Sequence, residues 1–163
     1  MGRVSGEERP RLTHVDATGA ARMVDVSGKD VTVRTATASG RVLVSPEVVA
    51  LLRGGAVPKG DALAVARLAG IMGAKRTPDL VPLCHPIAIH GVDVDLDVAD
   101  DAVHVSATVR TADRTGVEME ALTCVAVAGL ALVDMVKAVD PRASITDVRL
   151  LAKSGGKSGE WTR

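Results

Sequence analysis

Polar and hydrophobic residues alternate along two early segments of the chain, Ala20–Val26 and Val31–Val44, and both segments are rich in β-branched residues. A period of two with this composition predicts β-strands. A Ser-Pro-Glu sequence at 45–47 then predicts the start of a short helix, because serine caps helices and proline fits the first turn. The glycine pair at 54–55 predicts the end of that helix.

The next segment, from Gly60-Asp61 to about Lys75, has the hydrophobic period of a second helix. We expect its apolar side to be formed by Leu63, Ala66, Leu68 and Ile71. From there to His85, regular helix is excluded by three prolines: Pro78, Pro82 and Pro86.

The clearest hairpin is predicted over Ile87–Val98 and Ala102–Thr111, with a turn at Asp100-Asp101. Valine and leucine alternate with aspartate along its first strand, so the aspartates share one face. We interpret this face as the solvated side of the sheet.

A long helix is predicted from about Gly116 to Val139, and its middle is apolar all round, which predicts burial on every side. The last strand runs from about Ser144 to Ala152. The order strand, helix, strand, strand, helix, strand fits an α+β ferredoxin-like plait, a split βαβ, with an additional N-terminal strand region. Because this fold serves many functions, function has to be argued from the site.

Length and composition limit the class of protein. A chain of 163 residues favours one domain, and we expect a disordered tail over 1–11 and a single catalytic domain over 12–163. The tail lacks the apolar segment of a signal peptide, and the longest uncharged apolar run, Ala121–Val133, is too short to span a bilayer. Two cysteines, Cys84 and Cys124, suit reduced thiols. We therefore expect a cytoplasmic protein without membrane contact.

Charge and aromatic content argue against a nucleic acid partner. Lys plus Arg and Asp plus Glu each total 20, and the chain has no Phe, no Tyr and a single Trp. It therefore lacks a global positive field and the aromatic side chains on which bases stack. We expect a small anion held by a local basic pocket instead.

Asp134 lies near the C-terminal end of the long helix, where the helix dipole disfavours a negative charge, and Lys137 follows at i+3 on the same side. Two interpretations stay open. The pair is either a surface ion pair worth about 0.3–0.5 kcal/mol or a lysine held against a carboxylate for proton transfer. Glu118 and Glu120 lie at the opposite end, where carboxylates suit the dipole.

The segment Lys153–Gly159 resembles a phosphate loop but lacks the first glycine of the Walker A pattern, and no helix follows it. Its glycines expose backbone N–H groups beside Lys153 and Lys157, which predicts an anion-binding nest, with a mobile basic tail as the alternative. Lys59, just before a predicted helix start, is a further candidate for anion contact.

Cys84 and His85 are adjacent in a proline-bounded turn. Adjacent side chains do not normally chelate one metal, and no other histidine has ligand spacing to them, so we expect no metal site. A cysteine nucleophile assisted by a distant histidine stays open, as do substrate contact by His85 and a purely structural turn.

Eight motifs occur in a fixed order along the chain: Leu-Thr-His-Val-Asp (12–16), Met-Val-Asp-Val-Ser (23–27), Lys-Gly-Asp (59–61), Ala-Lys-Arg-Thr (74–77), Pro-Leu-Cys-His-Pro (82–86), Thr-Gly-Val-Glu-Met-Glu-Ala-Leu-Thr (115–123), Asp-Met-Val-Lys-Ala-Val (134–139) and Arg-Leu-Leu-Ala-Lys-Ser-Gly-Gly-Lys-Ser-Gly (149–159). Each is short, but the ordered set is specific. Over about Leu12–Glu160 the chain resembles the cyclic pyranopterin monophosphate synthase family, molybdenum cofactor biosynthesis protein C.

The resemblance implies a ferredoxin-like fold in a homohexamer, a trimer of dimers, with active sites at the dimer interface. The implied substrate is 3′,8-cyclo-7,8-dihydro-GTP, which becomes cyclic pyranopterin monophosphate with release of pyrophosphate. Asp134 is implied as the catalytic acid residue, and Lys59 and Lys137 as further functional residues. Substrate contacts are implied for Leu83, Cys84, His85, Met119 and Glu120, with Glu118 next to them.

The residues themselves and the resemblance agree on the type of site. A purine-derived triphosphate requires clustered cations, which four residues offer: Lys59, Lys153, Lys157 and Arg34. The chain has proton donors and acceptors but no nicotinamide or iron–sulfur motif, so we expect acid–base catalysis without a cofactor. The departures from the family pattern lie in the extended N-terminus and the Trp-containing C-terminal end. The alternatives are a non-catalytic nucleotide-binding regulatory protein and a structural oligomer.

Overall fold

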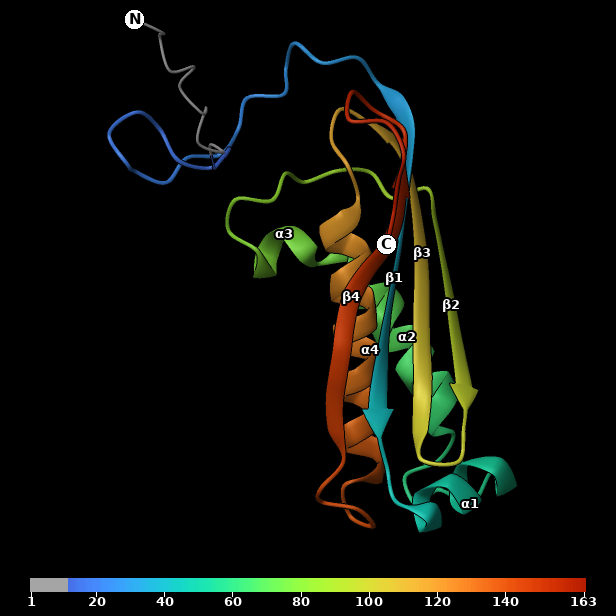
Figure 1. Ribbon diagram of the computed structural model, residues 1–163. Coiled ribbons are helices and arrows are strands. Elements are labelled where there is room, and N and C mark those ends of the chain that lie inside the picture. Colours follow the sequence, from blue (N-terminus) through green and yellow to red (C-terminus); the bar gives the residue numbers. More distant parts are fainter. Residues whose placement is uncertain (1–11) are drawn as a thin grey trace, which may run out of the picture.

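The computed structural model describes residues 12–163, so the predicted tail over 1–11 lies outside the described residues. Within them, one antiparallel sheet of five strands carries helices on one face (Figure 1). The elements are β1 (Thr32–Leu43), α1 (Pro46–Gly54), α2 (Ala62–Lys75), α3 (Thr77–Leu80), β2 (Gly91–Val98), β3 (Ala102–Asp113), α4 (Glu118–Val136), β4 (Ser144–Ser154) and β5 (Trp161–Thr162).

The strand order is β2-β3-β1-β4-β5, which confirms the ferredoxin-like α+β fold. The central strand β1 pairs with β3 from Thr32↔Asp113 to Leu43↔Ala102 and with β4 on its other side. Its side chains alternate, and Ala36, Ala38 and Val42 point into the core. The register therefore fixes one face of the sheet against the helices.

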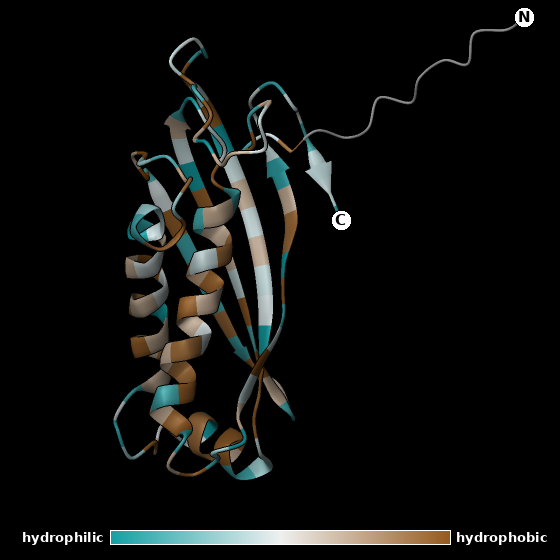
Figure 2. Ribbon diagram, turned by 90° about the vertical axis from the view of Figure 1, so that its left-hand side faces the viewer, coloured by the Kyte–Doolittle hydropathy of each residue, from teal (hydrophilic) through white to brown (hydrophobic). Residues whose placement is uncertain are grey.

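α2 and α4 lie side by side and cover the sheet (Figure 2). They approach closely at Gly70, where an added Cβ would lie 2.9 Å from the backbone oxygen of Cys124. Because backbone atoms cannot shift cheaply, a larger residue at this position would push the two helices apart. The core between them and the sheet is aliphatic, as the composition requires.

The predicted helix signals are confirmed. Ser45 Oγ accepts a hydrogen bond from the Val48 N–H at 3.3 Å at the start of α1, and Gly55 ends that helix in the left-handed region at φ 67°. Asp61 caps α2 in the same way, accepting from the Ala64 N–H at 3.0 Å.

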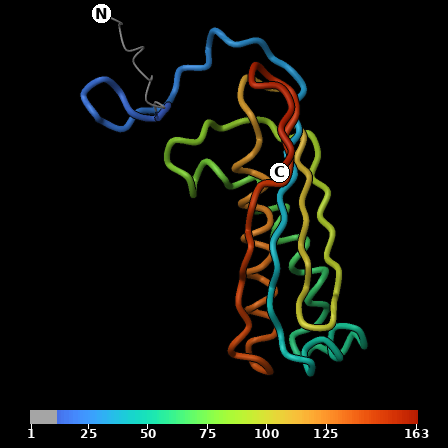
Figure 3. The backbone as a smooth tube through the Cα atoms, in the orientation of Figure 1, coloured from blue at the N-terminus to red at the C-terminus, as the bar shows by residue number. Residues whose placement is uncertain are grey.

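Three predictions about elements are wrong in detail. The strand expected over Ala20–Val26 is absent within residues 12–163, where that segment makes only the isolated bridge Val15↔Ala21. The proline region is not free of helix, since Pro78 sits in the first turn of the short α3, where its missing N–H costs nothing. The extra strand is the C-terminal β5, which folds back on β4 (Figure 3).

The predicted burial of the helices also needs correction. Leu68, expected on the apolar core side of α2, is 62% exposed, and Leu130 on α4 is 60% exposed. α4 is long and apolar enough to cross a membrane by length and composition alone, yet half of that stretch is buried inside this domain. It is therefore the core helix of the fold, with one apolar strip left uncovered.

Candidate functional site

The sequence-predicted site residues fall into two groups at opposite ends of α4. Asp134 and Lys137 lie at its C-terminal end near Lys59, whereas Glu118 and Glu120 lie in its first turn near Cys84. At about 1.5 Å per residue, Glu120 and Asp134 are roughly 21 Å apart along the helix. A single chain therefore does not bring the two groups together.

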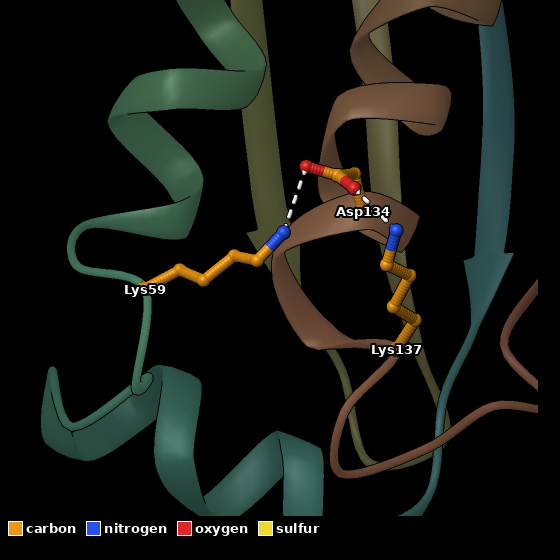
Figure 4. A network of polar contacts seen from close by, with 3 residues as sticks. All are labelled: Lys59, Asp134 and Lys137. Carbon is orange, nitrogen blue, oxygen red and sulfur yellow. Dashed lines mark hydrogen bonds and ion pairs between the residues drawn. The ribbon is translucent and has the colours of Figure 1, made fainter.

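The C-terminal group is a carboxylate between two lysines, which Figure 4 shows from close by. Lys137 Nζ lies 2.7 Å from Asp134 Oδ1 and Lys59 Nζ lies 3.1 Å from Oδ2, so each carboxylate oxygen accepts one ammonium donor. Lys59 comes from the loop between α1 and α2, and the other two residues come from the last turn of α4. All three side chains are about half exposed.

This geometry keeps Asp134 ionised. The hydrogen bond from Lys137, followed by that from Lys59, holds the pKa of Asp134 below its ordinary value. Near neutral pH the ionised carboxylate can therefore orient both ammonium groups. The predicted i+3 contact of Asp134 with Lys137 is confirmed, and Lys59 joins it.

The N-terminal group surrounds a pocket of about 1020 Å³. The turn after α3 contributes Leu83, Cys84 and His85, and the first turn of α4 contributes Glu118 and Met119. The other residues that line it are His14, Ala21, Val81, Pro82, Thr115, Gly116, Leu150, Lys153 and Trp161. Its walls are mostly apolar with a few polar groups, which is typical of a small-molecule site.

Half-buried Cys84 and fully buried Glu120 form a protonatable pair beside this pocket. The Cys84 thiol donates to Glu120 Oε1 at 3.5 Å, and Glu120 is only 1% exposed. Burial, and next the charge of Glu120, raises the pKa of Cys84 to about 11, while burial raises the pKa of Glu120 above its ordinary value. Since the thiol stays protonated near neutral pH, Cys84 is poorly suited to act as a nucleophile.

The hydrogen bonding of two side chains in this region, His85 and Glu120, differs. His85 Nε2 lies 2.5 Å from the carbonyl oxygen of Val24, so the ring is held by the segment before β1. Glu120 Oε2 is buried and has no hydrogen-bond partner among residues 12–163. A buried, unpaired carboxyl oxygen is costly in a folded protein, and this cost is typical of a functional position.

The glycine loop, Lys153–Gly159, lies beyond the N-terminal end of α4 (Figure 3), and its first residue, Lys153, lines the pocket. Lys153 Nζ lies 3.0 Å from Glu118 Oε1 and 3.0 Å from Ser158 Oγ, which ties the loop to the helix. Gly155 and Gly156 both adopt positive φ, at 86° and 74°. Their backbone conformation suits a concave nest of N–H groups.

Arg34 lies under this loop and is almost buried. Its Nε donates to the carbonyl oxygen of Asp113 at 3.1 Å, and a Cβ at Gly156 would collide with its guanidinium. Arg34, Lys153 and the loop backbone line a smaller polar cavity of about 200 Å³. Lys157 is exposed at the tip of the same loop. Three of the four predicted cations therefore gather at the N-terminal end of α4, and Lys59 does not.

Sequence reasoning missed several residues that line the pocket, including His14, Thr115 and Trp161. His14 and Thr115 stood inside motifs that were available as a signal. Trp161 had no such signal, because only the return of β5 onto β4 brings it to the pocket. Within residues 12–163, no group of three or more His, Cys, Asp or Glu side chains is placed to bind a metal ion.

Comparisons with known proteins find relatives that match nearly the whole chain. Residues 23–156 match the MoaC family. A cyclic pyranopterin monophosphate synthase of Streptomyces coelicolor is 74% identical over 98% of this chain and 94% of its own length. One of Nocardioides sp. is 71% identical over 94% and 96%, and cyclic pyranopterin monophosphate synthase 2 of Mycobacterium tuberculosis is 58% identical over 100% and 99%.

Proposed function

The chain belongs to the MoaC family, and we propose that it is a cyclic pyranopterin monophosphate synthase of molybdenum cofactor biosynthesis. Its reaction converts 3′,8-cyclo-7,8-dihydro-GTP into cyclic pyranopterin monophosphate and pyrophosphate. The observation that carries the proposal is the pairing of Asp134 with both Lys59 and Lys137, because this reaction consists of proton transfers and phosphoryl rearrangement.

Lys137 is the principal general acid and base of this proposal. Its ammonium nitrogen is held 2.7 Å from Asp134 Oδ1, which fixes the position from which Lys137 gives a proton to the substrate or takes one from it. Lys59, on the other oxygen of the same carboxylate, supplies a second positive charge beside the reacting groups. Asp134, as an ionised carboxylate, holds both lysines in place and supports proton transfer by Lys137.

The N-terminal end of α4 binds the substrate in this proposal. Leu83, Cys84, His85, Met119 and Glu120 contact its ring system, and Glu118 positions Lys153 through their 3.0 Å contact. The triphosphate is held by the glycine loop with the cations around it: Arg34, Lys153 and Lys157.

The two ends of α4 meet only between chains. We infer an isologous dimer in which the Asp134 end of one α4 faces the Glu120 end of the partner's α4, giving two composite sites. The separation of roughly 21 Å within one chain supports this, because a nucleotide-sized substrate cannot react at one end while bound at the other.

The dimer is one unit of a proposed homohexamer, a trimer of dimers. An uncovered apolar strip on the helical layer supports assembly beyond one chain, and it is formed by Val65, Leu68, Met72 and Leu130.

All catalytic elements lie in one domain over 12–163. We place the enzyme in the cytoplasm, where its free thiols Cys84 and Cys124 remain reduced.

Product analysis tests the proposal directly. The purified protein is incubated with 3′,8-cyclo-7,8-dihydro-GTP, and both the pterin product and pyrophosphate are quantified. We expect equimolar formation of the two. Recovery of unaltered substrate from a protein that binds it tightly would favour the non-catalytic nucleotide-binding regulatory protein instead. A melting temperature that does not respond to nucleotide would favour a structural oligomer.

A further inference from the structure

Trp161 is the chain's one Phe, Tyr or Trp residue. It lies on β5, is 40% exposed and lines the large pocket beside Cys84, His85 and Met119. A large indole that stays partly exposed at a pocket wall is available for a ligand. None of the roles assigned above uses it.

The sheet register aims Trp161 at the pocket. Trp161 pairs directly with Lys153 across the β4–β5 ladder, and directly opposed residues project from the same face of a sheet. Lys153 in turn stands opposite Ala36, which is fully buried on the helix-facing side of β1. The indole therefore faces the first turn of α4, and the neighbouring Thr162 faces away.

A β-bulge in β4 brings a further residue to the side of the sheet that lines the pocket. The pairing with β1 moves from Thr37↔Ala152 to Ala38↔Leu150 and skips Leu151. The skipped residue brings Leu150 and Lys153 to the same side although they are three positions apart. Leu150, Lys153 and Trp161 thus form one continuous surface of the pocket.

The C-terminal end fixes the indole in place. The backbone N–H of Arg163 donates to the carbonyl oxygen of Leu151 at 2.8 Å, and its Nε donates to that of Leu150 at 2.9 Å. The Arg163 guanidinium carbon lies 5.7 Å from the centre of the indole ring, within the range of a cation–π contact. The ring is therefore held rather than free to turn away from the pocket.

We propose that Trp161 is a positioning residue that stacks on the planar pyrimidinone ring of the substrate's purine-derived base. This rests on the proposed function, which supplies a ligand with such a ring. An indole offers a flat apolar surface that accepts a planar conjugated heterocycle without hydrogen-bond readout. The phosphates of that ligand reach the glycine loop that joins β4 to β5, so one hairpin binds both ends of the nucleotide.

Intrinsic fluorescence tests the contact without turnover, because the emission of the chain comes from this one indole. GTP and inorganic tripolyphosphate are titrated separately into the wild-type assembly. The same titrations into free tryptophan amide correct for absorption of the exciting light by GTP. We expect GTP to quench and shift the emission saturably, and tripolyphosphate to bind, by calorimetry, without that change. Unaltered emission at saturating GTP would overturn the proposal.

Three variants separate stacking from support of the loop. Trp161→Leu should bind GTP roughly tenfold more weakly and tripolyphosphate as the wild type does, whereas Trp161→Phe should recover most of the GTP affinity. Thr162→Ala, on the other face of the same strand, should change neither. Equal losses for GTP and tripolyphosphate in Trp161→Leu, or dissociation of its assembly in sedimentation, would show that the indole supports the loop or a subunit contact instead.

Failure of this inference differs from failure of the proposed function. A wild-type protein that forms product while its emission ignores GTP refutes only the stacking role. A wild-type protein that forms no product refutes the proposed function, whatever its fluorescence does.

Discussion

Asp134 accepts one hydrogen bond from Lys137 at 2.7 Å and one from Lys59 at 3.1 Å, so a single carboxylate organises two lysines from different elements. The helix dipole disfavours a negative charge at this end of α4, and the two ammonium groups offset that cost. The arrangement makes the carboxylate the centre of the group rather than an accessory of either lysine.

Lys137→Ala and Asp134→Ala should each lower turnover by about 10²–10⁴ while leaving folding and assembly intact, since both side chains are about half exposed. If they act as one unit, the double variant should lose little more than the worse single variant. Steady-state kinetics with sedimentation checks this. Lys75→Ala, on the exposed end of α2, is the control and should keep wild-type turnover. Near-normal turnover of Lys137→Ala would contradict the assignment.

Mixed assemblies test whether sites combine two chains. Asp134→Ala and His85→Ala should each be inactive alone, but in an isologous dimer each mixed pair contains one intact site. Co-expression should therefore restore about one quarter of the wild-type sites. The matched control is Asp134→Ala with Lys59→Ala, whose defects lie at the same end of α4, so that no intact site forms. Equal recovery in both mixtures would contradict composite sites.

The Cys84 thiol should react slowly with iodoacetamide near neutral pH and much faster only as the pH approaches about 11, the value to which burial and Glu120 raise its pKa. Glu120→Gln removes a negative charge that disfavours the thiolate. In this variant the pKa of Cys84 should fall, so alkylation should begin at a lower pH. Burial should still hold the pKa of Cys84 above that of a free thiol. Peptide mass spectrometry separates Cys84 from the fully buried Cys124. Fast alkylation of wild-type Cys84 at neutral pH would reopen the nucleophile interpretation.

Gly70→Ala should destabilise the protein by about 1–3 kcal/mol, because the new Cβ would lie 2.9 Å from the Cys124 backbone oxygen. This outweighs the better helix propensity of alanine, which is worth about 1 kcal/mol. Gly54→Ala, at a helical glycine with open space around it, should instead be neutral or slightly stabilising. Urea unfolding at one protein concentration compares the two variants with the wild type. Equal effects would mean that close packing of α2 on α4 contributes little.

Most of the fold could be predicted from the amino-acid sequence, because the signals for its helices and strands are local. Ser45 and Asp61 each cap a helix with their own side chain. In β2, the alternation of aspartate with apolar residues determines which face of the strand is exposed to solvent. The pattern failed over Ala20–Val26, where alternation of residue types was not matched by a partner strand to pair with. Alternation predicts which face would be buried, but only a neighbouring strand makes a segment part of a sheet.

The sequence also identified the Asp134–Lys137 pair, because a spacing of i+3 on a helix fixes two side chains on one side. Long-range packing brings Lys59 to this pair from another element. It also gathers the other predicted residues at the far end of α4 and places Trp161 at the pocket. These relations depend on how β5 and the loop between α1 and α2 pack against distant parts of the chain. Such long-range packing leaves no period or motif in the sequence, so it becomes visible only once the chain has folded.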